Sequence, residues 1–434
     1  MWPASEYRGA PGSQERLLYY ACAAAGLTAA STAVWWLTKE SYYSYVPIKV
    51  RGARRRRPIR VYMDGCFDLM HYGHANALRQ AKALGDQLVV GLIPDSEIRR
   101  CKGPPILNEA ERLKLVESVK WVDEVITGVP YDLTPEFLEE LLVKHKIDYV
   151  IHGDDPCLMP DGSDAYAHVK RMGRFRMIKR TEGVSTTDIV GRMLMCSRVS
   201  MPGSHEQQEL LTREFSRGRE DPVVADGDGE PELAASPKER NVTVSRFMPT
   251  SRRIVQFSSG RVPKPGARIV YIDGSFDLFH VGHIDILKKA RTLGDFLLVG
   301  VHTDEDVGER RGAFQPIMNL HERALSVLAC RYADEVIIGA PQIITEDLLT
   351  TFNINQVVRG SVHESGDGGS EAARYAVPKE KGLYERLDSP SDVTSATVIR
   401  RIVENRAQFE AKHAKKAASE AAYYSSAKQY VHEV

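Results

Sequence analysis

The stretch RVYMDGCFDLMHYGH, residues 60–74, decides how the first folded part of this chain begins. It opens with a short apolar run of β-favouring residues, passes through Gly65 and ends in two histidines, His71 and His74, on either side of Gly73. This pattern predicts a strand, then a tight glycine turn, then the first turn of a helix. Because the free N–H groups of a helix start attract anions, we expect a phosphate-binding site at this junction.

The same pattern returns later as RIVYIDGSFDLFHVGH, residues 268–283, with Asp273 opposite Asp64. The similarity continues, since AKALGDQLVVGL at 81–92 parallels ARTLGDFLLVGV at 290–301. Further on, residues 108–130 parallel residues 319–341. Self-similarity on this scale indicates a duplicated domain of about 140 residues.

Within the first copy, apolar runs alternate with helical patterns. We expect strands at 59–63, 87–92, 124–127 and 149–152, and helices at 74–83, 109–119 and 135–145. This alternation predicts the α/β class, with two tandem Rossmann-like domains whose parallel sheets carry helices on both faces. Ligands of such sheets bind beyond the carboxyl ends of the strands, which is where the glycine turn follows the first strand.

The composition excludes several classes of protein. The chain has 434 residues, of which 43% are hydrophobic and 27% charged, and this excludes disorder, collagen and a polytopic membrane protein. Basic and acidic residues balance at 58 each, so the whole molecule has no net charge with which to attract nucleic acid. The six cysteines form no C-x-x-C pair, so we expect neither a zinc site nor a disulfide framework, and we expect a reducing compartment.

Residues 17–37 contain no charged side chain and carry tyrosines near one end and tryptophans near the other. A helix of this length can cross a membrane, and the aromatic residues would lie at its two interfaces. We therefore predict one transmembrane anchor, with a buried helix or a cleaved secretory signal as alternatives. The arginine-rich flank would keep the rest of the chain in the cytosol, on the mitochondrial outer membrane or, alternatively, the endoplasmic reticulum.

The other boundaries follow from composition. An acidic stretch with Gly and Pro at 220–232 predicts a flexible linker, and a final segment rich in Ala, Glu and Lys predicts a helix. The predicted organisation is an N-terminal tail at 1–16, the anchor at 17–37, a basic juxtamembrane segment at 38–57, a first domain at 58–200, a linker at 201–262, a second domain at 263–402 and a C-terminal helix or tail at 403–434.

The first copy also contains RTEGVSTTD at residues 180–188. H-x-G-H together with this R-T-x-G-x-S-T pattern resembles the cytidylyltransferase family of the nucleotidylyltransferase superfamily, from residue 59 to about residue 410. The tandem arrangement resembles the members that act on phosphoethanolamine, and the N-terminal anchor resembles plant-type members. The resemblance implies an enzyme that transfers CMP from CTP to phosphoethanolamine, giving CDP-ethanolamine and pyrophosphate for phosphatidylethanolamine synthesis.

The resemblance also implies four catalytic residues in the first copy, namely His71, His74, Lys102 and Arg180. The nucleophile is already a phosphate anion and needs no general base, so these groups would align two polyanions and neutralise charge on the α-phosphate. Lys102 would bridge the phosphates of both substrates, and Mg²⁺ would arrive with CTP rather than at a protein metal site. The implied nucleotide-binding residues are Cys66, Phe67, Gly73, Gly153, Asp154, Ser185, Thr186 and Thr187, the last three with hydroxyls that would cap a helix.

Four residues are candidates for the amine end of the acceptor: Asp68, Tyr131 and the pair Asp154 and Asp155. A primary ammonium donates hydrogen bonds to carboxylates, whereas a trimethylammonium prefers an aromatic cage, best built with Trp. Choline-specific members of the family have Trp where this chain has Tyr131, which favours ethanolamine. The shared N-x-x-E-R at residues 108–112 has two open interpretations, a structural ion pair or a direct role in substrate binding.

The second copy retains both histidines but departs from the family pattern elsewhere. RRG at 310–312 replaces the lysine loop, RGSV at 359–362 replaces HGDD at 152–155, and Ser389 stands opposite Arg180. Without that lysine and arginine we expect no turnover, and the second copy would either bind a cytidine nucleotide or support the first through their interface. Its candidate nucleotide-binding residues are Ser275, Phe276, His280, Val281, Gly282, His283, Arg311, Arg359, Gly360, Ser361, Val362, Ser391, Thr394 and Ser395.

The sequence leaves alternatives open. The acceptor could be phosphocholine or glycerol 3-phosphate, or the chain could be a membrane-tethered nucleotide-binding scaffold without chemistry. The presence of all four catalytic candidates in one copy favours the enzyme. The oligomeric state is open as well, since the duplication either replaces a homodimer within one chain or coexists with one.

Overall fold

The computed structural model describes residues 57–154, 164, 166–181, 183–199, 248–312, 314–363 and 371–411. The predicted tail, the predicted anchor at 17–37 and nearly all of the basic juxtamembrane segment lie outside these residues. Among the helices that are described, none is long and apolar enough to cross a bilayer.

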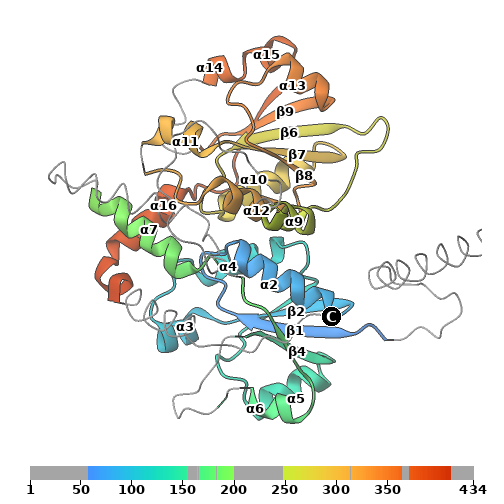
Figure 1. Cartoon of the computed structure of the whole chain (residues 1–434), viewed down its shortest axis with the longest axis vertical. Coiled ribbons are helices and arrows are strands. Elements are labelled where there is room, and N and C mark those ends of the chain that lie inside the picture. Colours follow the sequence, from blue (N-terminus) through green and yellow to red (C-terminus); the bar gives the residue numbers. More distant parts are fainter. Residues whose placement is uncertain are drawn as a thin grey trace, which may run out of the picture. The chain divides into compact units, whose positions relative to one another are not determined.

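The first copy is built on a five-stranded parallel sheet (Figure 1). Its strands are β1 (Arg60–Gly65), β2 (Gln87–Leu92), β3 (Glu124–Thr127), β4 (Tyr149–Gly153) and β5 (Phe175–Ile178), in the spatial order β3-β2-β1-β4-β5. The order reverses at β1, because β2 and β3 continue the sheet on one side and β4 and β5 on the other. Open parallel sheets bind their ligands outside the carboxyl ends of the strands at such a reversal.

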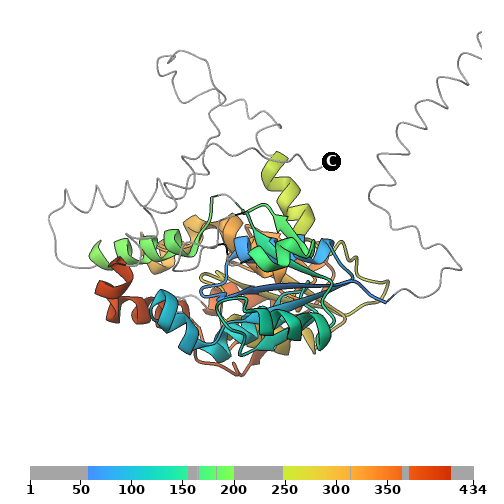
Figure 2. The same cartoon turned by 90° about the horizontal axis from the view of Figure 1, so that it is seen from below.

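Helices cover both faces of this sheet (Figure 1; Figure 2). They are α2 (Tyr72–Ala83), α3 (Asp95–Lys102), α4 (Glu109–Ser118), α5 (Pro135–Val143), α6 (Ala167–Arg171) and α7 (Thr186–Val199). Successive residues of β1 point to opposite faces, so Val61 shares a buried cluster with side chains of α2 and α4, and Tyr62 shares one with side chains of α5 and α6. The sheet therefore has an apolar layer on each side.

The second copy repeats this architecture (Figure 1). Its strands are β6 (Ile269–Gly274), β7 (Phe296–Val301), β8 (Glu335–Ile338), β9 (Ile354–Gly360) and β10 (Tyr384–Leu387), parallel and in the order β8-β7-β6-β9-β10. Its helices are α10 (Val281–Arg291), α11 (Asp304–Arg311), α12 (Leu320–Ala329), α13 (Glu346–Thr351), α14 (Glu371–Arg374), α15 (Ala376–Glu380) and α16 (Ser395–Glu404). The prediction of two tandem parallel α/β domains is confirmed.

Every element expected in the first copy is present, with ends that differ from the predicted ones by no more than two residues. Three elements of the first copy, α3, α6 and β5, were not predicted from the sequence. Along its whole length α3 buries only Ile98, so it has no apolar stripe that periodicity could detect. Strand β5 is four residues long and buries only Ile178, which is too short a pattern to separate from a loop.

Part of the predicted linker is folded. The segment 201–262 was expected to be flexible, but its residues 248–257 form α9 (Met248–Phe257). Phe257 is fully buried, and its ring meets the ring of Trp121 edge-on with a centroid distance of 5.1 Å. The linker prediction was therefore wrong for this part, because the folded chain packs α9 against Trp121 of the first copy and against α12 of the second. Residues 201–247 lie outside the described residues.

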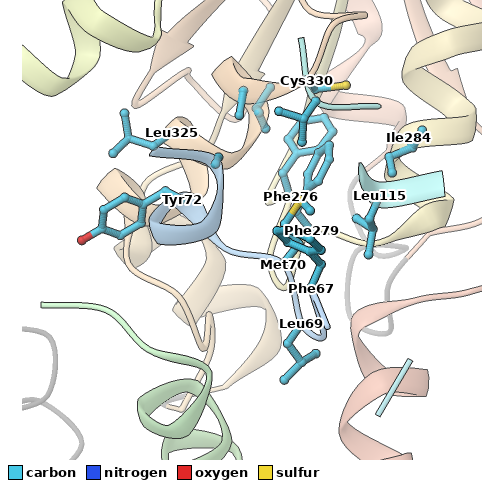
Figure 3. Packing of buried hydrophobic residues seen from close by; sticks show 14 of the residues in the cluster. Phe67, Leu69, Met70, Tyr72, Leu115, Phe276, Phe279, Ile284, Leu325 and Cys330 are labelled. Carbon is cyan, nitrogen blue, oxygen red and sulfur yellow. The ribbon is translucent and has the colours of Figure 1, made fainter. Parts of the chain in front are cut away.

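The two copies share one hydrophobic core. Phe67 and Met70 in the turn after β1, and Phe276 and Phe279 in the turn after β6, belong to a single cluster of buried side chains (Figure 3). The backbones also pair across the interface, since the Lys120 N–H donates to the Ala329 carbonyl at 3.0 Å and the Arg331 N–H donates to the Ser118 carbonyl at 2.8 Å. The turns that follow the two central strands therefore help to hold the copies together.

Candidate functional site

The two histidines of the first copy lie at the start of α2 and face one another, with ring centroids 4.1 Å apart. His71 is the N-cap residue, and its Nδ1 accepts a hydrogen bond from the Gly73 N–H at 3.1 Å. The Nδ1 of His74 accepts a longer bond, 3.4 Å, from the His71 N–H. Because a backbone donor engages each Nδ1, a neutral imidazole carries its proton on Nε2. The pair therefore offers two Nε2–H donors at the start of α2.

Gly73 lets the helix start approach its surroundings closely. A Cβ at this position would lie 2.8 Å from His71 Cε1 and 2.9 Å from Val184 Cγ1. The equivalent Gly282 is enclosed still more tightly, since its Cβ would lie 2.3 Å from the Val393 carbonyl oxygen. All three distances are shorter than nonbonded atoms tolerate, so glycine is required at this position in each copy.

The turn after β1 is strained. Phe67 and Leu69 have φ angles of 48° and 45°, a left-handed conformation that bulky residues rarely adopt. The second copy repeats it at Phe276 and Leu278, with φ of 50° and 47°. Such strain persists only where the surroundings impose it, and it is typical of functional sites.

Asp68 is one of the groups that impose this conformation. Its two carboxylate oxygens accept hydrogen bonds from the N–H groups of Ile106 and Leu107, at 2.8 and 2.9 Å. Asp277 makes the same pair of bonds in the second copy, to Ile317 and Met318, at 2.7 and 2.9 Å. The contacts that are seen are therefore those of a scaffold residue, and the role of Asp68 in acceptor binding stays a prediction.

The structure decides between the two interpretations of N-x-x-E-R at residues 108–112, a structural ion pair or a direct role in substrate binding. Arg112 is fully enclosed and donates to the carbonyls of Cys66 and Ile93 at 2.7 and 2.9 Å and to the Asp95 carboxylate at 2.6 Å. Glu111 accepts from the Asn108 N–H in the cap of α4 and forms an ion pair with Arg401 of the second copy. Burial raises the pKa of Glu111, but the hydrogen bonds from Arg401 and from the Asn108 N–H, together with the positive charge of Arg401, hold that pKa below its usual value. The motif is structural.

Lys102 closes one side of the site. It is the last residue of α3, and its Nζ lies 3.9 Å from the Cys66 sulfur and 5.1 Å from the centre of the Tyr131 ring. Gly103 follows with a φ of 80°, which turns the chain away from the helix. Tyr131 packs against the small buried cluster of Ile93, Ile98 and Val129. Three residues predicted for separate subsites, Cys66, Lys102 and Tyr131, are thus neighbours.

The ends of β4 and β5 close the other side. The Asp154 carboxylate accepts from the Arg180 N–H at 3.0 Å. Ser185 caps α7 as expected, because its Oγ accepts from the Asp188 N–H at 3.1 Å, and the Thr186 hydroxyl donates to the Asp68 carbonyl at 3.4 Å. Gly153 ends β4 and Thr187 is buried. Asp155 lies outside the described residues.

The sequence reading assigned no role to Asp64, which the structure places at the carboxyl end of β1. Burial raises the pKa of this carboxyl group, and nearby His152 and Lys102 offset the rise only in part. The Tyr166 hydroxyl lies 3.5 Å from its Oδ1, and the Tyr166 ring lies 4.6 Å from the ring of His152. The sequence could have indicated Asp64 as a site residue, because an acid stands at the end of the central strand in both copies, at Asp64 and at Asp273. A carboxylate that is costly to ionise in a binding crevice is a candidate functional group.

The equivalent acid of the second copy, Asp273, has hydrogen-bond partners and a cationic neighbour within the chain. Asp273 accepts hydrogen bonds from Tyr375 Oη at 2.6 Å, from His302 Nε2 at 2.9 Å and from Arg374 Nη2 at 3.0 Å. Burial would raise the pKa of Asp273, but the contacts with His302 and Arg374 hold it well below its usual value. The chain itself thus supplies the positive charge beside Asp273.

The second copy contains a cavity of about 110 Å³ at the carboxyl ends of β6 and β9. The predicted residues that line it are Ser275, Phe276, His280, Gly282, His283, Arg311, Arg359, Gly360, Val362, Ser391 and Thr394. Val281, Ser361 and Ser395 do not line it. Ser361 instead accepts from the Ser389 N–H at 2.8 Å, which matches the Asp154–Arg180 contact and supports placing Ser389 opposite Arg180.

The contrast between the two acids gives a prediction about stability. At pH 7, Asp273→Asn should lower the free energy of unfolding by about 3–5 kcal/mol, because it leaves the buried Arg374 guanidinium without its anion. Asp64→Asn should change it by less than about 1 kcal/mol or raise it, since it removes a carboxylate that is costly to ionise.

Urea unfolding at several pH values checks both variants. The lowered pKa of Asp273 means that its stabilising contribution exists above the unfolded pKa near 3.8 and is lost as the pH falls toward the folded value. The raised pKa of Asp64 means that stability falls as the pH rises through its folded value, and Asp64→Asn should remove that fall. Equal destabilisation by the two substitutions at pH 7 would contradict this account.

Comparisons with known proteins agree with this geometry. A family model described as Cytidylyltransferase-like matches residues 62–192 and 271–376, one segment in each copy. The chain is 58% identical over 375 residues to the ethanolamine-phosphate cytidylyltransferase of Arabidopsis thaliana, an alignment that covers 86% of this chain and 87% of that one. The ethanolamine-phosphate cytidylyltransferase of Mus musculus is 43% identical over 391 residues, 88% of this chain and 94% of that one.

A relative with a different acceptor in its name matches much less of the chain. The choline-phosphate cytidylyltransferase A of Rattus norvegicus is 46% identical over 146 residues, which is 33% of this chain and 39% of that one. Only relatives with both copies can align over most of the chain, as the plant and mouse proteins do. The chain belongs to the cytidylyltransferase-like family, in the group of ethanolamine-phosphate cytidylyltransferases.

Proposed function

We propose that this chain transfers CMP from CTP to phosphoethanolamine, giving CDP-ethanolamine and pyrophosphate. A phosphate oxygen of phosphoethanolamine forms a bond to the α-phosphorus of CTP, and the bond from that phosphorus to the pyrophosphate oxygen breaks. The observation that carries the proposal is the grouping of His71, His74 and Lys102 at the end of β1, in a chain that aligns over 86% of its length with the ethanolamine-phosphate cytidylyltransferase of Arabidopsis thaliana. The phosphocholine, glycerol 3-phosphate and scaffold alternatives are not favoured.

The first copy can perform this transfer by placement and charge alone. The two Nε2–H donors and the start of α2 would stabilise the charge that grows on the α-phosphate oxygens. Lys102 would bridge the phosphates of the two substrates from the end of α3. The attacking group is already anionic, so the site needs donors rather than a base. Arg180 and the residues at the start of α7 would contact the nucleotide, and Mg²⁺ bound to the triphosphate would neutralise the departing pyrophosphate.

Asp64 is our candidate for the ammonium group of the acceptor. In the second copy, the Arg374 guanidinium brings positive charge to the equivalent acid, and His302 donates a hydrogen bond to it. In the first copy, a primary ammonium could supply the same charge and hydrogen bonds to Asp64, with the Tyr166 hydroxyl nearby. Asp68, Asp154 and Asp155 remain the other candidates from the sequence.

Steady-state kinetics with purified protein tests this assignment. Wild type should turn over phosphoethanolamine much faster than phosphocholine or glycerol 3-phosphate. His71→Ala should lower kcat about 100-fold or more, because one transition-state donor is lost. Asp64→Asn should raise KM for phosphoethanolamine about tenfold and leave KM for CTP unchanged, since it removes one charge from the acceptor site only. No CTP-dependent pyrophosphate release with any acceptor would refute the enzyme, and a uniform rise of both KM values would refute the role of Asp64.

For the second copy we propose nucleotide binding without turnover. Its cavity retains both histidines, two arginines and several hydroxyl groups, which suit an anionic nucleotide. The position equivalent to the acceptor amine already has the Arg374 guanidinium, so a second ammonium there would meet like charge.

Calorimetric titration of CTP checks the number of sites. Wild type should bind two CTP molecules per chain, and His280→Ala should lose the second one while it retains kcat within about threefold, as expected for a site remote from the chemistry. The control is His71→Ala, which should retain the second-copy site. A single site in wild type, or unchanged activity and CTP binding in His280→Ala, would remove any nucleotide role for this copy.

We also propose that residues 17–37 anchor the chain in a membrane, with the catalytic domains in the cytosol. The uncharged span and its arginine-rich flank support this topology. The mitochondrial outer membrane is favoured and the endoplasmic reticulum is the alternative. Fractionation of a tagged chain should place it in a carbonate-resistant membrane pellet, and a variant without residues 1–50 should become extractable. A mature protein that lacks residues 1–50 would refute the anchor.

A further inference from the structure

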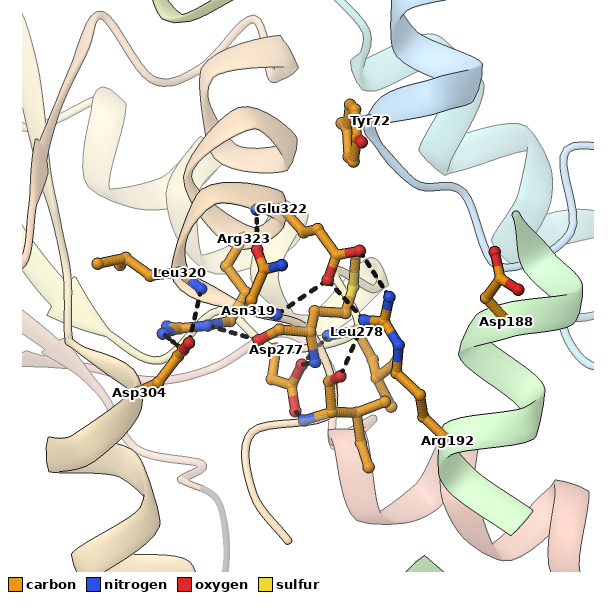
Figure 4. A network of polar contacts seen from close by, with 12 residues as sticks. Tyr72, Asp188, Arg192, Asp277, Leu278, Asp304, Asn319, Leu320, Glu322 and Arg323 are labelled. Carbon is orange, nitrogen blue, oxygen red and sulfur yellow. Dashed lines mark hydrogen bonds and ion pairs between the residues drawn. The ribbon is translucent and has the colours of Figure 1, made fainter. Parts of the chain in front are cut away.

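In each copy, one arginine binds a glutamate in the first turn of a helix of the other copy. Arg192 of α7 binds both carboxylate oxygens of Glu322, at 2.7 and 3.0 Å, and donates to the Ile317 carbonyl at 3.2 Å (Figure 4). Glu322 is the glutamate of the second N-x-x-E-R, at the start of α12. Arg192 therefore comes from the first copy and holds the chain just before a helix of the second.

A second pair has the opposite arrangement, with the arginine in the second copy and the glutamate in the first. Arg401 of α16 binds both oxygens of Glu111, at 2.7 and 2.8 Å, and donates to the Ile106 carbonyl at 3.3 Å. The two pairs differ in burial. The Arg192 and Glu322 side chains are 7% and 3% exposed, whereas those of Arg401 and Glu111 are 31% and 10% exposed. Loss of the more buried Arg192 should therefore lower the free energy of unfolding more than loss of Arg401 does.

The segment held by Arg401 leads directly from Lys102 of the active site. Residues 103–107 connect Lys102, at the end of α3, to Asn108, at the cap of α4. Asp68 holds the end of this segment from within the first copy, through the N–H of Ile106. Arg401 holds it from the second copy, through the carbonyl of Ile106 and through Glu111. The backbone next to the catalytic lysine is thus fixed from both copies.

We propose that Arg401 is a positioning residue for the first-copy active site, which it serves from the second copy by fixing the segment that carries Lys102. This inference rests on the proposed function of Lys102, and it gives the second copy a role in catalysis that requires no chemistry there. Arg192 makes the same contact toward a segment in which Arg311 and Gly312 replace the lysine loop. Arg192 is therefore a matched control, with equal geometry and no catalytic lysine at its far end.

The experiment compares Arg401→Met with Arg192→Met in the full chain. Arg401→Met should lower kcat/KM for CTP about tenfold or more, since small displacements of a catalytic group have effects of this size. Arg192→Met should lower the midpoint of thermal unfolding more than Arg401→Met does, but it should retain wild-type kcat. Arg401→Lys should recover part of the activity, and Glu111→Gln should reproduce the loss without further loss in the double variant, because both act on one contact.

Hydrogen exchange supplies a readout that needs no turnover. Arg401→Met should speed amide exchange in residues 99–108 and leave residues 310–319 unchanged, and Arg192→Met should do the reverse. Absence of turnover in wild type would refute the proposed function, while the exchange pattern would still test the contact. Wild-type kinetics and exchange in Arg401→Met, or equal activity losses in the two variants that follow their thermal midpoints, would overturn the proposal.

Discussion

The fully buried guanidinium of Arg112 is the interaction on which the first-copy site depends. It ties the carbonyls of Cys66 and Ile93, at the ends of β1 and β2, to Asp95 at the start of α3. Arg323 makes the equivalent contacts in the second copy, with the carbonyls of Ser275 and His302 and with Asp304. The Nη1 and Nη2 groups of this enclosed arginine donate to partners within the protein, so these partners cannot move independently. The strained turn that leads to the histidines follows from this constraint.

The two copies show how one scaffold supports different chemistry. Their strand orders, strained turns, helix caps and enclosed arginines correspond position by position. What differs is the charge at the carboxyl end of the central strand. Asp64 has a raised pKa, whereas Asp273 is paired with Arg374 and accepts hydrogen bonds from His302 and Tyr375, which hold its pKa low. A carboxylate that the chain leaves costly to ionise can be stabilised by a ligand, and one that the chain has already paired cannot.

Much of the site could be predicted because its signals are local. A glycine turn between a strand and a helix, and histidines at the helix start, depend on neighbours a few residues away. Asp68 was assigned to the acceptor because an acid near a binding turn has the right chemistry. Its contacts with Ile106 and Leu107 come from a distant part of the chain, which no local pattern reveals. Asp64 was passed over for the related reason that its raised pKa arises from burial in the folded chain.

The sequence by itself determined the duplicated α/β fold, the family and the position of the glycine turn that leads to the two histidines, because apolar periodicity and motif spacing act over short separations. Only the tertiary structure decided that α9 belongs to the folded body and that the glutamates of N-x-x-E-R bind arginines of the opposite copy. It also decided which of two equivalent acids is paired. These properties depend on which distant side chains meet and how much water they exclude, and a one-dimensional pattern does not contain that information.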